Sequence, residues 1–441
     1  MKLAVIGSGI SGLGAAWLAH QDPSGRYDVR LFEKDSRIGG HANTVIAEKD
    51  DISVPVDTGF IVYNEMNYPN LTNLFKVLDV ETIASDMSFG VSLRDGELEY
   101  EGSLRGLFAQ KKNILSPRFW SMIRGLVSFY KHAVVEQHNG PEDETLGAFI
   151  DRCRLPDAFV EDHLLPMGAA IWSCPSESMR SYPVRAFIQF LENHRLLDFT
   201  GRPQWRTVKG GSRSYVHKIR QALGSRISTG VDICGLRREA GGVILSIKGD
   251  GDVWFDKVIM AAHADESLAI ISDAHTEERD ILSSFSFQPN QVILHSDPRL
   301  MPKANKAWAA WNYETLSTEE SAGVCVTYWM NRLQSIDYSF PLFVTLNPLR
   351  MPADHLIHQK FSYEHPVFDT KAIIAQQRLK GIQGHNNLHW CGAWTANGFH
   401  EDGLKSAVAT MKTLGVTVPW QSDIIAYPNY DTSTLDHTKA G

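Results

Sequence analysis

The first forty residues carry a glycine pattern that few folds can accommodate. Residues 2–6, which are apolar from Leu3 onward, lead into Gly7, Gly9 and Gly12, and a second largely apolar run ends at Glu33. We expect a buried strand, a tight glycine turn, a helix and a second strand with an acid at its tip. Gly9 lets the backbone approach a pyrophosphate, and the helix N-terminus offers unpaired N–H groups to it. The pattern therefore predicts a dinucleotide-binding domain.

Further residues narrow the choice of dinucleotide. The Glu33 carboxylate is suited to accept hydrogen bonds from a ribose diol and would repel a 2′-phosphate, which argues against NADP. Gly39 and Gly40 form a second glycine pair, which indicates backbone packed against a larger cofactor. We expect FAD, bound noncovalently because no cysteine lies in an evident flavin-linking motif. The residues expected around it are Gly7, Gly9, Ser11, Gly12, Glu33, Lys34, Arg37, Gly39, Gly40, His41, Gly59, Phe60, Ile233, Ala261, Gly392, Ala393, Phe399, Asp402, Gly403 and Leu404.

The expected nucleotide domain is discontinuous, because strand-like runs near residues 226–233, 253–263 and 388–394 look like further pieces of it. A final helix is expected from Gly403 to Leu414. The fold class is therefore α/β, and α+β overall: a Rossmann-like FAD-binding domain with an inserted substrate domain of mixed sheet plus helices. The expected limits are 1–80, 201–280 and 381–420 for the FAD domain, 81–200 and 281–380 for the substrate domain, and 421–441 for a loosely held tail.

Composition excludes several classes of function. A net charge of −8 argues against general nucleic-acid binding. No apolar run reaches the roughly 18 residues of a membrane-spanning helix. The five scattered cysteines favour free thiols in a reducing compartment, and no signal peptide is evident, so we expect a cytoplasmic location. His385 and His389 lack a third ligand, so we expect no metal site.

Residues 102–135 reverse the charge of the chain, since they contain no Asp or Glu. The basic residues of this segment are Arg105, Lys111, Lys112, Arg118, Arg124 and Lys131. They alternate with apolar and aromatic residues, and a helix is expected after Pro117. One interpretation is peripheral contact with an anionic membrane surface. The other is an ordinary core-facing helix with a solvated basic face.

Ten short motifs run in order along most of the chain. They are 7–12, Glu33-Lys34, 39–41, 86–89, 106–113, 171–176, 201–205, 208–210, 326–329 and 398–403. In these motifs the chain resembles the flavin-containing amine oxidase superfamily. It is more closely similar to the flavin-binding domain that precedes the methyltransferase domain of plant cyclopropane fatty acid synthases, and to stand-alone bacterial proteins of that type. It departs from amine oxidases at Ala393, where they usually carry an acid, and no aromatic cage is identifiable.

The resemblance implies a lipid substrate, and with the basic segment it predicts FAD-dependent dehydrogenation of a fatty acyl chain. The substrate is expected to be unsaturated or methyl-branched and esterified in phospholipid, with a hydride passing to flavin N5. The alternatives are oxidation of a small amine, a non-catalytic flavoprotein partner of a lipid methyltransferase, and redox-neutral isomerisation.

The candidates for moving the second proton are Tyr63, His41, His400 and Glu401. His41 either approaches the flavin or only caps a turn. Residues 400–403 are expected at a helix start whose N–H groups face the flavin, although Asp402 alone fits a plain N-cap.

Overall fold

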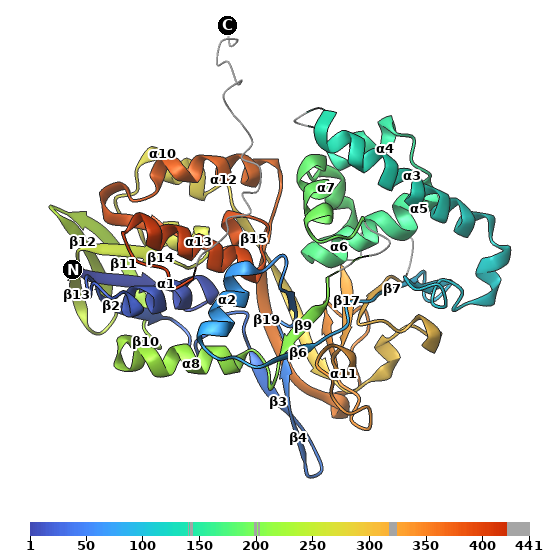
Figure 1. Ribbon diagram of the computed structural model, residues 1–441, viewed down its shortest axis with the longest axis horizontal. Helices are drawn as coiled ribbons and strands as arrows, with labels where there is room; N and C mark the ends of the chain where they lie inside the picture. The colour runs from blue at the N-terminus through green and yellow to red at the C-terminus, as the bar shows by residue number, and fades with distance from the viewer. Residues whose placement is uncertain (140, 142–143, 198–200, 202, 317–323, 421–441) are drawn as a thin grey trace, which may run out of the picture.

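The structure is a computed structural model that describes residues 1–139, 141, 144–197, 201, 203–316 and 324–420. Figure 1 shows a nucleotide-binding lobe around the N-terminus and a helical lobe at the opposite end. Strands of a large sheet lie between the two lobes, and the β3–β4 hairpin projects from the middle of the molecule. The predicted tail, 421–441, lies outside the described residues.

The nucleotide-binding lobe is built on a five-stranded sheet of order β10-β2-β1-β14-β20. Its strands are β1 (Lys2–Ile6), β2 (Asp28–Glu33), β10 (Ile227–Thr229), β14 (Lys257–Met260) and β20 (Leu388–Trp390). Every neighbouring pair is parallel. The sheet therefore draws on three distant parts of the chain, as a doubly wound domain with long insertions requires.

The apolar strands of this sheet are covered on both faces, because alternate residues point to opposite sides. Leu3 and Val5 join a core cluster with α1 (Ile10–Gln21), α8 (Arg213–Leu223) and α13 (His400–Thr413). Ala4 and Ile6 join a second cluster with an antiparallel sheet. The strands of that sheet are β11 (Ile233–Glu239), β12 (Gly242–Ile247) and β13 (Gly251–Phe255).

The second large element is a seven-stranded sheet of order β19-β15-β18-β17-β16-β7-β8. Its strands are β7 (Phe89–Leu93), β8 (Leu98–Glu101), β15 (Ser286–His295), β16 (Trp311–Glu314), β17 (Cys325–Trp329), β18 (Phe343–Leu346) and β19 (Ile357–Val367). The β16–β7 pair is parallel and the other pairs are antiparallel, so the sheet is mixed. This mixed sheet and the parallel one together confirm the predicted fold class.

The helical lobe packs over the β7–β8 end of this sheet. Its helices are α3 (Pro117–Asn139), α4 (Leu146–Arg152), α5 (Asp157–Phe159), a π-helical turn (Val160–Leu164), α6 (Leu165–Trp172) and α7 (Val184–Asn193). Two smaller sheets are β3 (Thr44–Lys49) with β4 (Ile52–Asp57), and β5 (Tyr63–Asn64), β9 (Trp205–Val208) and β6 (Thr82–Ala84). The remaining α-helices are α2 (Pro69–Val77), α9 (Ala264–Ile270), α10 (Thr276–Leu282), α11 (Met330–Leu333) and α12 (Thr370–Ile382).

Two predicted boundaries were wrong. The last helix begins at His400 rather than Gly403, because Phe399 takes the extended N-cap conformation and the acids that follow belong to the first turn. The expected strand over 226–233 is two strands, since the chain leaves β10 at Thr229 and enters β11 at Ile233. None of the helices in the described part of the chain combines the length and apolar content needed to cross a lipid bilayer.

Candidate cofactor site

The turn between β1 and α1 has the geometry of a phosphate cradle. Gly7 has a φ of +98°, which favours glycine. A Cβ on Gly12 would lie 1.8 Å from the Gly7 carbonyl oxygen, so only glycine fits there. A Cβ on Gly9 would meet nothing within 4 Å, and α1 has no side-chain N-cap. Open space therefore lies in front of unpaired N–H groups at a positive helix end.

The tip of β2 and the loop after it frame the same turn. Glu33 accepts a hydrogen bond from the Ser8 N–H at 2.8 Å. The Gly39 N–H donates to the Ser8 carbonyl at 3.0 Å, and a Cβ on Gly40 would lie 3.0 Å from Gly9 Cα. The predicted acid and the second glycine pair are thus in direct contact with the cradle.

The N-terminus of α13 packs closely against the start of α1. A Cβ on Gly403 would approach both Ile10 Cγ2 and Ser11 Oγ to 2.8 Å. Asp402 is the third helical residue and not the N-cap; its carboxylate accepts the Phe399 N–H at 3.0 Å, and burial raises its pKa to about 6. The two helix starts in contact give this region two positive dipole ends.

These features fit FAD. The open cradle at Gly9 suits a pyrophosphate, and Glu33 stands at the strand end where a ribose diol is bound. Among the other predicted contacts, Arg37 donates to the Gly40 carbonyl at 2.8 Å and Lys34 is exposed at the end of β2. The remaining predicted residues are placed as follows: Ile233 begins β11, the Ala261 carbonyl lies against Gly7, the Gly392 N–H donates to Ser406, Ala393 follows Gly392, and Leu404 is buried against Gly14.

His41 has a buried ring nitrogen, Nε2, with no hydrogen-bond partner in the described part of the protein. Its ring centroid lies 5.0 Å from that of Tyr363 and 5.2 Å from that of His365. Burial, together with the positive potential of nearby His365, lowers the pKa of His41 well below its ordinary value. A neutral imidazole with an unpartnered nitrogen can accept a proton.

The loop of His41 is held rigidly from the seven-stranded sheet. The Tyr363 hydroxyl on β19 accepts from Asn43 Nδ2 at 2.7 Å and lies 2.7 Å from the Thr58 hydroxyl. The His41 carbonyl accepts the Phe60 N–H at 2.8 Å, and a Cβ on Gly59 would lie 2.3 Å from it. The Gly59–Phe60 turn therefore packs directly on the His41 backbone.

His400 lies on the other side of Phe60. The two rings stack with centroids 3.8 Å apart and planes 8° apart. The Tyr215 hydroxyl on α8 lies 2.7 Å from His400 Nε2, and burial lowers the pKa of His400 to about 3. His400 is thus neutral and has one nitrogen already engaged.

The other two proton-transfer candidates, Glu401 and Tyr63, form hydrogen bonds within the protein. Glu401 accepts the N–H groups of Asn70 at 3.0 Å and Leu71 at 2.9 Å, so its carboxylate caps α2. Tyr63 lies in the core and donates to the Thr82 hydroxyl at 3.3 Å. Of the four candidates, His41 is the one with an unpartnered buried nitrogen in the described residues.

Sequence reasoning missed Tyr215, Tyr363 and His365. Each contacts its partner across long separations in the chain; Asn43 and Tyr363, for example, are 320 residues apart. Nothing in their own neighbourhoods marks them, because a tyrosine or histidine in an amphipathic helix or strand is ordinary core composition.

Comparison with known proteins agrees with this geometry. The sequence profile of the flavin-containing amine oxidoreductase family matches residues 10–335. A search of curated proteins finds no match.

Solved structures share the fold at low sequence identity. A CLA-producing fatty acid isomerase from P. acnes has 15% identity and a TM-score of 0.66, with 93% of this chain and 98% of that chain covered. Cyclohexylamine oxidase from Brevibacterium oxydans has 14% identity and a TM-score of 0.65, covering 94% and 99%. Reduced UDP-galactopyranose mutase has 14% identity and a TM-score of 0.65, covering 95% and 96%. With the cradle and the family match together, this chain belongs to the flavin-containing amine oxidoreductase family and is an FAD-dependent oxidoreductase.

Proposed function

We propose that the protein dehydrogenates a fatty acyl chain that is unsaturated or methyl-branched and esterified in phospholipid. The observation that carries this proposal is the composition of one face of the seven-stranded sheet, which begins beside His41. The basic segment and the resemblance to lipid-modifying flavoproteins support the same substrate class.

The strand register defines this face, because residues paired across neighbouring strands point to the same side. Tyr363, which contacts His41, shares a side with Phe361 on the same strand. The register then continues through Val292, Leu346, Val326, Tyr328, Trp311, Phe89, Val91 and Tyr100. We call this side the aromatic face; it reaches from β19 to β8.

The aromatic face suits an alkyl chain better than a cationic amine. Phe361, Tyr328, Trp311 and Phe89 are only partly buried, so apolar surface is left for a ligand. The same register places the strand carboxylates on the opposite side, at Glu99, Glu101, Glu314 and Glu364. An ammonium on the aromatic face would have ring faces but no strand carboxylate to contact, whereas an acyl chain gains free energy by burying its methylenes there.

The reaction needs a hydride acceptor and a base. FAD supplies the hydride acceptor when bound, and dioxygen or another electron acceptor regenerates it. One C–H bond loses its electron pair and hydrogen as hydride, the adjacent C–H bond loses a proton, and a C=C bond forms between the two carbons. An allylic or branched position favours the first step, because the developing charge is delocalised. His41 is the residue we assign to the proton, since its buried Nε2 has no hydrogen-bond partner among the described residues.

The test is to mix the holoprotein with lipid vesicles without oxygen. Reduction of the flavin is monitored as a loss of its visible absorbance, called bleaching below. Unsaturated phospholipid should bleach the holoprotein, and a saturated phospholipid should not. Phe361→Glu places a carboxylate on the aromatic face and should abolish bleaching. The neighbouring Ser362→Glu, on the opposite and exposed side of β19, is the matched control and should not.

The same assay separates the alternatives. Bleaching by a panel of small amines, with none by lipid, would overturn the proposal in favour of amine oxidation. Bleaching by neither, together with capture of a lipid methyltransferase, would favour a non-catalytic partner role.

A further inference from the structure

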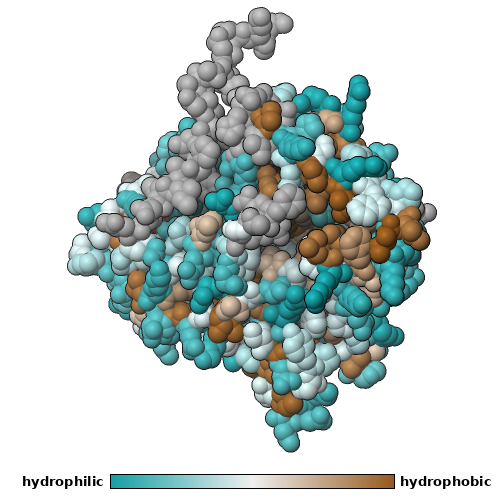
Figure 2. Space-filling view, turned by 45° about the vertical axis from the view of Figure 1, so that its right-hand side comes forward, coloured by the Kyte–Doolittle hydropathy of each residue, from teal (hydrophilic) through white to brown (hydrophobic). Residues whose placement is uncertain are grey.

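We infer that residues 102–120 form a docking surface for an anionic lipid bilayer; the inference builds on the proposed phospholipid substrate. Leu104 and Leu115 are 84% and 86% exposed, the highest values among the large hydrophobic residues that the structure describes. Ile114 is 51% and Trp120 is 43% exposed. Figure 2, in which the right-hand end of Figure 1 is turned forward, shows apolar residues gathered among polar ones on this side.

Three of the four cations of this surface have no ion-pair partner among the described residues; the fourth, Arg118, pairs with Glu161 and Asp162. Arg105, Lys111 and Lys112 are exposed and form no ion pair with any residue in the described ranges. Arg124 and Lys131 continue the same charge along α3, also exposed and without a described ion pair. In a chain of net charge −8, these positive charges beside exposed leucines are complementary to anionic headgroups over hydrocarbon.

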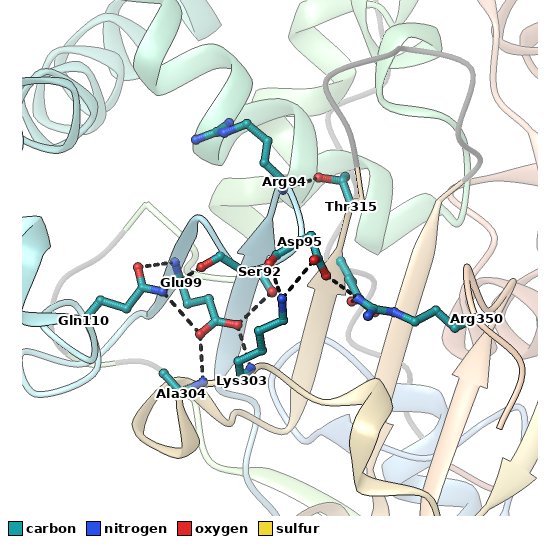
Figure 3. A network of polar contacts seen from close by, with 11 residues as sticks. Ser92, Arg94, Asp95, Glu99, Gln110, Lys303, Ala304, Thr315 and Arg350 are labelled. Carbon is teal, nitrogen blue, oxygen red and sulfur yellow. Dashed lines mark hydrogen bonds and ion pairs between the residues drawn. The ribbon is translucent and has the colours of Figure 1, made fainter. Parts of the chain in front are cut away.

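The surface is fixed in place and is not a loose loop. Gln110 accepts the Glu99 N–H at 3.1 Å and donates to the Gly96 carbonyl at 2.9 Å. Buried Asn113 donates to the Glu99 carbonyl at 3.2 Å. Figure 3 shows the Glu99 carboxylate receiving Ser92, Gln110, Lys303 and Ala304 on the edge of the sheet. These hydrogen bonds hold Gln110 and Asn113 against the sheet edge. Leu104, Leu115, Lys111 and Lys112 remain exposed to solvent.

The pattern favours a bilayer over a protein partner, because exposed aliphatic side chains lie in the same short segment as exposed cations. Leu107 and Phe108 pack inward against the apolar cluster that holds Tyr100 and Phe119. The Trp120 indole N–H donates to the Ile114 carbonyl at 2.9 Å, which places an aromatic ring at the border of the exposed patch. Leu104, Leu115, Ile114 and Trp120 thus form an exposed apolar edge above this packed cluster.

The test is co-sedimentation of the holoprotein with vesicles of phosphatidylcholine, with or without phosphatidylglycerol, at low and high salt. Wild type should bind only the anionic vesicles, and salt should weaken binding. The double variant Leu104→Ser/Leu115→Ser should bind at least about tenfold more weakly. Lys111→Gln/Lys112→Gln should lose about fivefold per charge. Flavin content and circular dichroism should stay unchanged, because these side chains are exposed.

Helix α12 offers matched controls at a distant site. Ile374→Ser removes another half-exposed apolar residue, and Lys371→Gln/Lys380→Gln removes two exposed charges. Both should bind vesicles as wild type does. Equal losses in control and test variants, equal binding to neutral vesicles, or absence of wild-type binding would overturn the inference. So would a dimer that Leu104→Ser/Leu115→Ser dissociates without changing lipid binding.

Vesicle binding is measured without turnover, so its failure and that of the proposed function are separable. Vesicle binding without bleaching leaves the docking surface standing and removes the acyl substrate. Bleaching by detergent-dispersed lipid without vesicle binding would support the acyl substrate and overturn the docking surface.

Discussion

Gly9→Ala should weaken FAD binding without damaging the fold. Gly9 has φ −63° and ψ −179°, which alanine adopts readily, and its Cβ would meet nothing within 4 Å of protein. The substitution should therefore lower the free energy of unfolding of the apoprotein by less than about 1 kcal/mol.

The main effect of Gly9→Ala is expected on the affinity for FAD. Backbone N–H groups hold phosphate oxygens at about 2.7–2.9 Å, whereas a methyl carbon needs about 3.5–4 Å to its neighbours. The added methyl of Gly9→Ala would displace the pyrophosphate enough to break one or two hydrogen bonds to a charged group. At roughly 1.5 kcal/mol each, that weakens FAD affinity between about tenfold and a hundredfold.

The assay is titration of apoprotein with FAD by fluorescence quenching, paired with chemical denaturation. Gly102→Ala, whose Cβ would meet only the Phe89 carbonyl at 3.9 Å, is the neutral control. Gly12→Ala should instead destabilise the fold, because its Cβ would lie 1.8 Å from the Gly7 carbonyl oxygen. Wild-type FAD affinity in Gly9→Ala, or a loss of stability equal to that of Gly12→Ala, would refute the reasoning.

Three further outcomes concern the buried carboxylates. Glu401→Ala leaves the N–H groups of Asn70 and Leu71 unpaired and should lower the free energy of unfolding by about 2–4 kcal/mol in urea; an unchanged midpoint would contradict the capping role. Burial raises the pKa of Glu401 from 4.5 to about 7, so its folded state holds the proton more tightly. The contribution of Glu401 to stability is then complete below about pH 4.5, and on the order of 3 kcal/mol of it is lost as the pH rises through 7, a slope that Glu401→Gln should reduce. Asp162→Asn removes the fully buried charge between Arg94 and Arg118 and should cost roughly 2–3 kcal/mol, measured by thermal unfolding at two salt concentrations; equal stability of variant and wild type would show that the pairs contribute little.

The nucleotide-binding half was predictable because its signals are local. Gly7, Gly9 and Gly12 act within one turn, and Glu33 ends the next strand, so periodicity and spacing carry the information. The helix at residues 400–413 was also predicted, but its start was placed three residues late, since Phe399 and not an ordinary capping residue occupies the N-cap.

The rest depends on contacts between distant segments. Strand β9 pairs with β5 and β6, for example at Tyr63 and Arg206. No local sequence pattern predicts this pairing. Glu401 has a side chain that can transfer a proton, but its carboxylate caps a helix that lies more than 300 residues earlier in the chain. The aromatic face could not be predicted from the sequence, because alternation within each short strand does not show which strands are neighbours. It is defined by the strand register in the structure.

The most direct measurement of the proposed reaction is mass spectrometry of phospholipid incubated with aerobic holoprotein. We predict acyl chains that have lost two hydrogens, with the product absent for Phe361→Glu and present for Ser362→Glu. Acyl chains of unchanged mass and double-bond position would contradict acyl dehydrogenation, and a shifted double bond at unchanged mass would replace it with isomerisation.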